Sequence, residues 1–360
     1  MLDRIIFIII GIVIFGILIA IHELGHFLAA KRLGVKVNEF AIGMGPKIWS
    51  KQKGETLYAL RLLPIGGSCM MEGEDAEVPD PRAFTAAKRW RRVVILAAGA
   101  FFNFLLGVLI VLILSFITSS FAGTTITALA PGFPDNGAQG LQVGDKMVSI
   151  NGERLYYRDD FSMFMALPAA ADGVVDMVVL RDGQRVTLKD YAFAPREYTE
   201  YGVTSVRYGI TLNSLEPTFG EKLRYAGYTT FNYVRMVRIG LVQLVSGGAG
   251  VKDLSGPVGI VTAITDVGAD KRVPFGDRLA TAANFGALIA INLAIMNLLP
   301  IPALDGGRIF ALIVTFFIEK ITRKRVNPKY EGYVHAAGMV LLLGLMAVVM
   351  FNDIVKLVTK

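Results

Sequence analysis

Long apolar runs alternate with polar segments along the chain. Four runs stand out, at residues 5–30, 93–121, 282–299 and 334–355. Each is long enough for an α-helix to cross about 30 Å of hydrocarbon, which takes roughly 20 apolar residues. The pattern predicts a polytopic α-helical membrane protein with about four transmembrane helices.

The first run is too long for a secretory signal peptide. Such a peptide has an apolar stretch of about 7–15 residues, followed by small residues at a cleavage site. Here the run continues to Ala30 and carries the sequence HELGH, residues 22–26, where a cleavage site would stand. We therefore expect the run to remain in the protein as its first membrane span.

The charge pattern indicates topology rather than nucleic-acid binding. The net charge is +7, from 37 Lys and Arg against 30 Asp and Glu, and basic residues concentrate in segments 31–92 and 320–329. Short loops rich in Lys and Arg stay on the cytoplasmic side of a membrane. Both termini and the long central segment are therefore expected outside, although Lys356 and Lys360 run against the rule.

The segment between the first two runs has the pattern of a β-hairpin. A polar, glycine-containing stretch at residues 51–55 separates β-prone residues 40–49 from residues 56–62. Its flanks are too apolar for water, and non-helical backbone at membrane depth is tolerated only against protein or a wet cavity. We expect a re-entrant β-hairpin beside the first helix, with a small cytoplasmic β-unit as the alternative.

The central segment predicts a small β-rich domain over residues 123–205. Residues 140–152 form a short strand that ends in an Asn-Gly turn, and Asp182-Gly183 marks a type I′ hairpin. Apolar positions then recur every three or four residues from 219 to 245, which indicates a helix. Its tyrosines and arginines suit a helix lying in the membrane interface, with packing onto the β-rich domain as the alternative.

These patterns divide the chain into four expected parts. Residues 1–122 hold the first two spans and the hairpin, and residues 123–205 form the β-rich domain. Residues 206–280 hold the interfacial helix and a connecting segment, and residues 281–360 hold the last two spans.

The HELGH sequence fits the zinc-binding motif H-E-x-x-H. On a helix, His22 and His26 share a face and can reach one zinc ion, while Glu23 can take a proton from water. A charged side chain at mid-bilayer costs about 2.5–3.5 kcal/mol on insertion scales, so its presence indicates a function. The alternative is a histidine pair that only joins helices.

Asp305 is the candidate for the third zinc ligand, because catalytic zinc sites normally have three protein ligands. Pro300 and Pro302 prevent regular helix before it, and the two glycines after it let the backbone turn sharply. The first and third spans both run inward, so HELGH and Asp305 should reach a similar depth. His335, the other histidine, opens the fourth span, where we expect an interfacial role.

Cys69 is the only cysteine, so the chain has no intramolecular disulfide. We expect a buried thiol, with a role near the metal as the alternative.

These residues resemble the site-2 protease family, and within it the bacterial RseP-type intramembrane zinc metalloproteases. The resemblance rests on HELGH, on NLLPIPALDG at residues 297–306 and on a PDZ-like insert. It covers essentially the whole chain, including a GxxxN match at residues 99–103 and the sequence SGPVGI at 255–260. Residues 140–155 and the later hairpin indicate one PDZ-like domain, where some relatives carry two.

The resemblance implies a zinc metalloendopeptidase for regulated intramembrane proteolysis. It would cleave the transmembrane segment of a single-span partner, such as an anti-sigma factor or a remnant signal peptide. Zinc held by His22, His26 and Asp305 would activate water and polarise the scissile carbonyl. Glu23 would act as the general base.

Substrate contacts follow from the same resemblance. An unwound substrate could pair with an edge of the hairpin at residues 56–62, which includes Tyr58 and Leu60. Asn292 and Asn297 would hold substrate backbone near the metal, with interhelical hydrogen bonding as their alternative.

The PDZ-like domain could capture a new carboxyl terminus or exclude partners with bulky outer domains. We favour the size filter, because the sequence shows no clean carboxylate-binding loop. The expected location is the bacterial plasma membrane, with the PDZ-like domain outside, the active site near the cytoplasmic side, and substrate and lipid as partners.

The sequence gives less support to two other functions, a transporter and a scaffold. A membrane transporter would need polar residues along the other spans, and residues 93–121 and 334–355 offer few. A non-catalytic scaffold would not need Glu23 beside the histidines.

Overall fold

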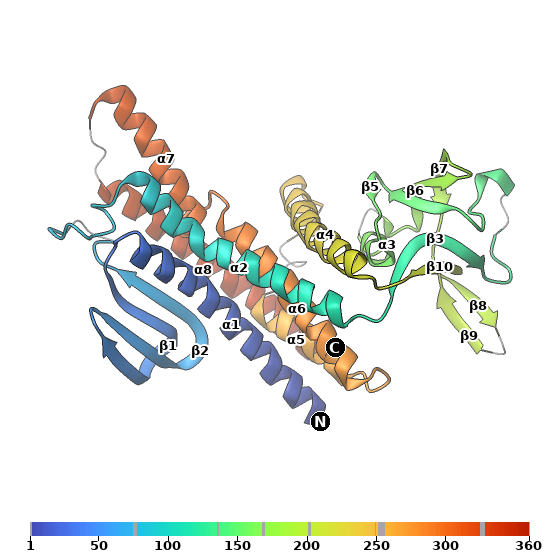
Figure 1. Cartoon of the computed structure of the whole chain (residues 1–360), viewed down its shortest axis with the longest axis horizontal. Helices are drawn as coiled ribbons and strands as arrows, with labels where there is room; N and C mark the ends of the chain where they lie inside the picture. Colours follow the sequence, from blue (N-terminus) through green and yellow to red (C-terminus); the bar gives the residue numbers. More distant parts are fainter. Residues whose placement is uncertain are drawn as a thin grey trace. The chain divides into compact units, whose positions relative to one another are not determined.

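The computed structural model describes residues 2–74, 78–134, 137–167, 170–200, 203–248, 250, 256–324 and 328–359. Contacts divide the chain into two compact units (Figure 1). The membrane unit comprises Met1–Leu114 and Tyr233–Lys360, and the β-rich unit comprises Ser115–Asn232. Ser255, which opens the SGPVGI segment, lies outside the described residues.

Within the described residues, four helices are long and apolar enough to cross a membrane. They are α1 (Leu2–Arg32), α2 (Arg89–Ile117), α6 (Phe275–Asn297) and α8 (Pro328–Thr359). Each coincides with one of the four apolar runs, so that prediction is confirmed. The second helix ends earlier than expected, at Ile117, because strand β3 begins at Phe121.

Small residues let these helices approach closely. A Cβ atom at Gly25 of α1 would overlap the backbone of Ala98 in α2. A Cβ atom at Gly107 of α2 would lie 2.6 Å from the side chain of Ile291 in α6. Helix α2 therefore packs with its backbone almost in contact with both α1 and α6.

A further apolar helix, α5 (Pro257–Ala269), has 13 residues, too few to cross a membrane. It packs along the first half of α1, where Phe7 lies against Gly268 and Gly11 lies against Val261. The two helices therefore run in opposite directions.

Charged side chains of opposite sign form hydrogen bonds at the two ends of α5. Oδ2 of Asp353, a buried residue of α8, accepts hydrogen bonds from the backbone N–H groups of Gly256 and Gly259, each at 2.9 Å. At the other end, the buried Arg278 donates to the carbonyl of Gly268 at 2.5 Å. A negative charge at the N-terminus and a positive charge at the C-terminus both complement the helix dipole.

The hairpin between α1 and α2 consists of β1 (Val37–Lys53) and β2 (Thr56–Met71). It is longer than predicted and folds back on itself. Phe40 pairs with Tyr58 on one side and with Cys69 on the other. The first part of β2 therefore lies inside the sheet, and its last part, residues 67–71, lies at an edge.

Helix α7 (Asp305–Thr322) follows the proline-rich loop after α6. Its charged residues form ion pairs with the rest of the membrane unit, Arg308 with Glu74 and Glu319 with Arg89. These pairs connect the helix that begins at Asp305 to the loop after β2 and to the start of α2.

The β-rich unit contains a sheet with strand order β10-β3-β4-β6-β7, to which β5 adds through β4. A separate hairpin pairs β8 with β9. The strands are β3 (Phe121–Leu129), β4 (Lys146–Ile150), β5 (Glu153–Arg154), β6 (Val174–Arg181), β7 (Gln184–Ala192), β8 (Arg196–Glu200), β9 (Val203–Arg207) and β10 (Ile210–Leu215). Asp182 and Gly183 both have positive φ between β6 and β7, as a type I′ turn requires.

The sheet extends beyond the predicted range 123–205, since β10 pairs with β3. Two helices complete the unit, α3 (Arg158–Met165) and the first part of α4 (Phe219–Ser246). Phe121 and Tyr225 stack with their ring centroids 4.4 Å apart, and Tyr157 donates a hydrogen bond to Glu221 at 2.6 Å. The start of α4 thus packs on the β-rich unit, which was the alternative to an interfacial helix.

Candidate metal centre

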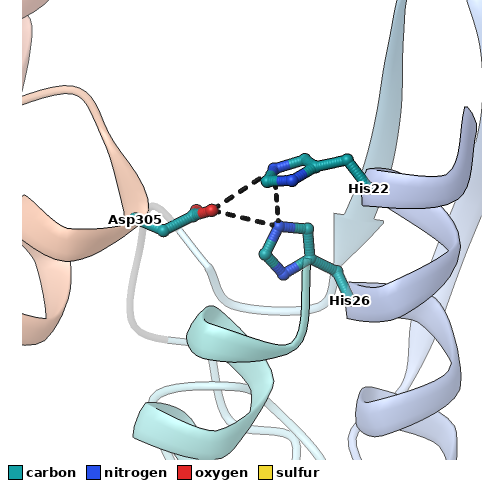
Figure 2. Close-up of side chains that lie close together, drawn as sticks. All are labelled: His22, His26 and Asp305. Atoms are coloured by element: carbon teal, nitrogen blue, oxygen red, sulfur yellow. Dashed lines mark hydrogen bonds and ion pairs between the residues drawn. The ribbon is translucent and has the colours of Figure 1, made fainter. Parts of the chain in front are cut away.

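Three side chains from two distant segments converge inside the membrane unit (Figure 2). His22 and His26 project from α1, and Asp305 projects from the first residue of α7. Oδ2 of Asp305 lies 3.3 Å from Nε2 of His22 and 3.4 Å from Nε2 of His26. The two Nε2 atoms are 3.1 Å apart.

These distances fit the edges of a tetrahedron around one zinc ion. Zinc binds nitrogen and oxygen ligands at about 2.0–2.2 Å, which places two tetrahedral ligand atoms about 3.3–3.6 Å apart. Oδ2 of Asp305 is buried and has no hydrogen-bond partner among the described residues. A buried carboxylate oxygen without a donor is costly, and a cation bound there would satisfy it. The donor set of two imidazoles and one carboxylate also suits zinc.

Helix α2 orients the His26 imidazole. Nδ1 of His26 donates a hydrogen bond to the carbonyl of Ile95 at 2.8 Å, which leaves Nε2 as the free ligand atom. Gly99, one turn further along α2, faces both histidines, and a Cβ atom there would overlap Nε2 of His26. The position therefore requires glycine for close approach.

The loop before α7 sets the position of Asp305. Ala303 has a φ of 75°, and its backbone N–H donates a 3.0 Å hydrogen bond to Nδ1 of His335. Cβ atoms at Gly306 and Gly307 would overlap the backbone of residues 298–301. His335 thus stabilises the loop that carries Asp305 and stays outside the three-residue cluster, in accord with the choice of Asp305 as the third ligand.

Glu23 lies beside this cluster. It interacts electrostatically with both histidines and with Asp305. Its side chain also packs against Gly67 of β2, where a Cβ atom would lie 2.9 Å from Cγ of Glu23. Glu23 therefore lies beside both the three-residue cluster and the edge of the β1–β2 sheet.

The expected substrate edge at residues 56–62 is wrong. Tyr58 pairs with both Phe40 and Lys51, and Leu60 pairs with both Ile42 and Trp49, so both residues lie inside the sheet. The hairpin folds back on itself, and local sequence pattern does not reveal such a fold. Among the described strands, the edge beside Glu23 is formed by residues 67–71.

The remaining candidates are more dispersed. Asn292 is exposed on α6, and Asn297 is half-buried at its end. Neither side chain makes a hydrogen bond with another described residue, so no interhelical bond explains them. Cys69 is buried in a core cluster with Val37, Ile95 and Leu312, as expected for a structural thiol.

Sequence reasoning gave no role to Ile95, Gly99 or Gly67, although the first two lie against His26 and the third against Glu23. The GxxxN stretch contained a signal for Gly99. A main-chain acceptor such as the carbonyl of Ile95 leaves no signal in side-chain chemistry.

Comparison with known proteins agrees with this centre. The family model of peptidase family M50 matches residues 10–345. A protein of Clostridium perfringens named as a zinc metalloprotease is 36% identical over 97% of this chain and 98% of its own length. The Bacillus subtilis regulator of sigma-W protease RasP is 31% identical over 96% of this chain and 97% of its own length. The RasP zinc metalloprotease of Geobacillus kaustophilus is 29% identical over 96% and 97%. The chain therefore belongs to peptidase family M50 and is a zinc metalloprotease with membrane-spanning helices.

Proposed function

We propose that the protein cleaves the transmembrane segments of partner proteins, with His22, His26 and Asp305 as the zinc ligands. The observation that supports this most strongly is the position of the cluster. Three ligand atoms within 4.8 Å of one another sit between helices long enough to cross a membrane, with a carboxylate beside them. A peptide bond that reaches this cluster must come from a segment at membrane depth.

Different residues of the chain contribute different parts of the hydrolysis reaction. When bound, a zinc ion supplies Lewis acidity at this position. The carboxylate of Glu23 accepts the proton of the attacking water and passes it to the leaving amide nitrogen. The carbonyl of Ile95 keeps the proton of His26 on Nδ1, which preserves Nε2 as a ligand.

The substrate must be extended before it can react, because a helix hides its peptide groups in its own hydrogen bonds. We place the extended segment on residues 67–71, whose outer edge has no strand partner among the described residues. Leu60, which is 45% exposed, contributes apolar surface to the sheet. Tyr58 supports the sheet through its contacts with Phe27 and Phe40. On α6, the side-chain amides of Asn292 and Asn297 make no hydrogen bond with described residues and are available to substrate backbone.

The substrate class and the orientation are part of the same proposal. Single-span proteins of the anti-sigma-factor type fit a relative named as a regulator of sigma-W. The basic segments on either side of residues 93–299 favour an active site near the cytoplasmic face and a β-rich unit outside. We propose that this unit is a PDZ-like size filter, which excludes partners whose outer domains have not been removed.

The test compares the wild type with Glu23→Gln in detergent, using a single-span model substrate. Loss of the general base should lower the cleavage rate about 10²–10⁴-fold while the bound zinc per protein stays unchanged. Glu55→Gln, which removes a half-buried carboxylate from the turn between β1 and β2 together with its ion pairs to Lys31 and Arg82, is the matched control and should keep full activity. Equal cleavage by wild type and Glu23→Gln would refute the role of Glu23. Wild type that binds zinc yet cleaves no truncated substrate would favour a scaffold.

A further inference from the structure

An apolar groove runs between the C-terminal end of α1 and the N-terminal half of α2. Its volume is about 580 Å³, within the roughly 300–1,000 Å³ typical of ligand sites. It is lined by Leu28, Ala29, Arg32, Leu33, Val94, Ala97, Ala98, Phe101 and Phe102. Eight of these nine residues are apolar, so the groove suits a hydrocarbon chain.

Positive charge gathers at the Arg32 end of the groove, from Arg32, which lines it, and from Arg91, which contacts the lining residue Leu33. Arg32 is exposed and has no ion-pair partner among the described residues. Arg91 donates to the carbonyl of Leu33 at 3.3 Å, while its Nε atom is buried without a described hydrogen-bond partner. The exposed Trp90 lies beside it, with the Arg91 guanidinium 5.5 Å from the ring centroid. Tryptophan and arginine together are typical of the lipid headgroup level.

We propose that this groove is a binding site for one anionic glycerophospholipid. An acyl chain fills the groove between Leu28 and Phe101, and the phosphate binds the guanidinium groups of Arg32 and Arg91. Guanidinium groups match phosphate through paired, charge-assisted hydrogen bonds. In a bilayer, the surfaces of membrane-spanning helices are in contact with lipid acyl chains, so such chains can enter the groove.

The alternative occupant, a substrate helix, fits the groove poorly. None of its lining residues belongs to α6, α7 or the β1–β2 sheet, which carry Asp305 and the edge beside Glu23. The groove instead lies next to the part of α2 that packs against the two histidines. Ala98 lines it and also contacts Gly25 of α1, while the next residue, Gly99, faces both histidines. A bound lipid would therefore support the α1–α2 contact that orients His26.

The test is native mass spectrometry of the purified full-length protein titrated with phosphatidylglycerol or phosphatidylcholine. Wild type should bind one phosphatidylglycerol in preference to phosphatidylcholine. Arg32→Gln and Arg91→Gln should each weaken phosphatidylglycerol binding about fivefold. Ala97→Trp should fill the groove and abolish the tight site. Lys53→Gln removes the same charge from an exposed position on β1 and should change nothing.

Two results would overturn the proposal. One is equal binding of both lipids that is unaffected by the arginine changes. The other is displacement of phosphatidylglycerol by glycerol phosphate, which would mean that a free phosphate rather than a lipid is recognised. Retention of phosphatidylglycerol when a single-span model peptide is added in excess would further support it, whereas competitive loss would assign the groove to substrate.

Discussion

Two aspartates, one in each unit, are held in opposite ways. In the β-rich unit, the fully buried carboxylate of Asp145 accepts two hydrogen bonds from Arg181, at 2.8 and 2.7 Å, and one from the backbone of Gln142. In the membrane unit, Oδ2 of Asp305 accepts none from the described residues and faces two imidazole nitrogens. A satisfied carboxylate supports a fold, whereas an unsatisfied one beside further ligands indicates a cation site.

A third aspartate, the buried Asp353, shares features with both. It is satisfied, but by the backbone N–H groups of Gly256 and Gly259 rather than by a cation. In the absence of water, the first N–H groups of a helix need such an acceptor. Because the three aspartates have different partners, we expect their mutation to have three different effects.

The largest effect on activity is expected for Asp305→Asn, which keeps the shape of the side chain but removes its charge. Changes to residues behind a metal ligand already cost about 10–100-fold in affinity or activity, so loss of a direct ligand should exceed about 100-fold. Zinc content and cleavage rate measure this. The metal-free variant should be at least as stable as the metal-free wild type, because an unsatisfied charge has been removed, and a clear loss of stability would show that Asp305 has a structural role.

The largest effect on stability is expected for Asp145→Ala. It leaves the guanidinium of Arg181 largely buried without its partner, and breaking such a pair costs about 3–5 kcal/mol. Hydrogen exchange in the full-length protein should accelerate in β4 and β6. Zinc content should remain at the wild-type level, and its loss would contradict the division of roles between the two aspartates.

A smaller effect is expected for Asp353→Leu, which leaves two backbone donors of α5 unsatisfied. Loss of a side-chain acceptor at the N-terminus of a helix costs about 0.5–2 kcal/mol, and thermal unfolding in detergent should report the loss. Asp353→Asn keeps an acceptor oxygen and should recover most of the stability. Equal destabilisation by both variants would mean that charge, rather than hydrogen bonding, holds the end of α5.

Much of the membrane unit could be predicted from sequence, because its signals are local. Apolar run length located four helices, and the spacing of His22 and His26 placed both on one face of α1. The need for a third ligand, together with the prolines and glycines around Asp305, predicts that this residue lies near the histidines, and the structure brings the three side chains together.

The parts that sequence did not reveal depend on pairings between distant residues. Phe40 has two strand partners because the hairpin folds back, and alternation within each strand is the same in a simple hairpin. Likewise, nothing near Asp353 in the sequence shows that its partner is a glycine almost a hundred residues earlier. Register and helix pairing are properties of the folded chain.

The separation of the metal ligands in the chain has a further consequence. His26 and Asp305 come from almost opposite ends of the sequence, so a cation held by both closes nearly the whole chain into one loop. A covalent cross-link over such a loop would restrict the unfolded chain by on the order of 5 kcal/mol. The proposed zinc ion would restrict the unfolded chain in the same way, and its removal by a chelator should expose the loop before α7 to added protease without any change in covalent structure.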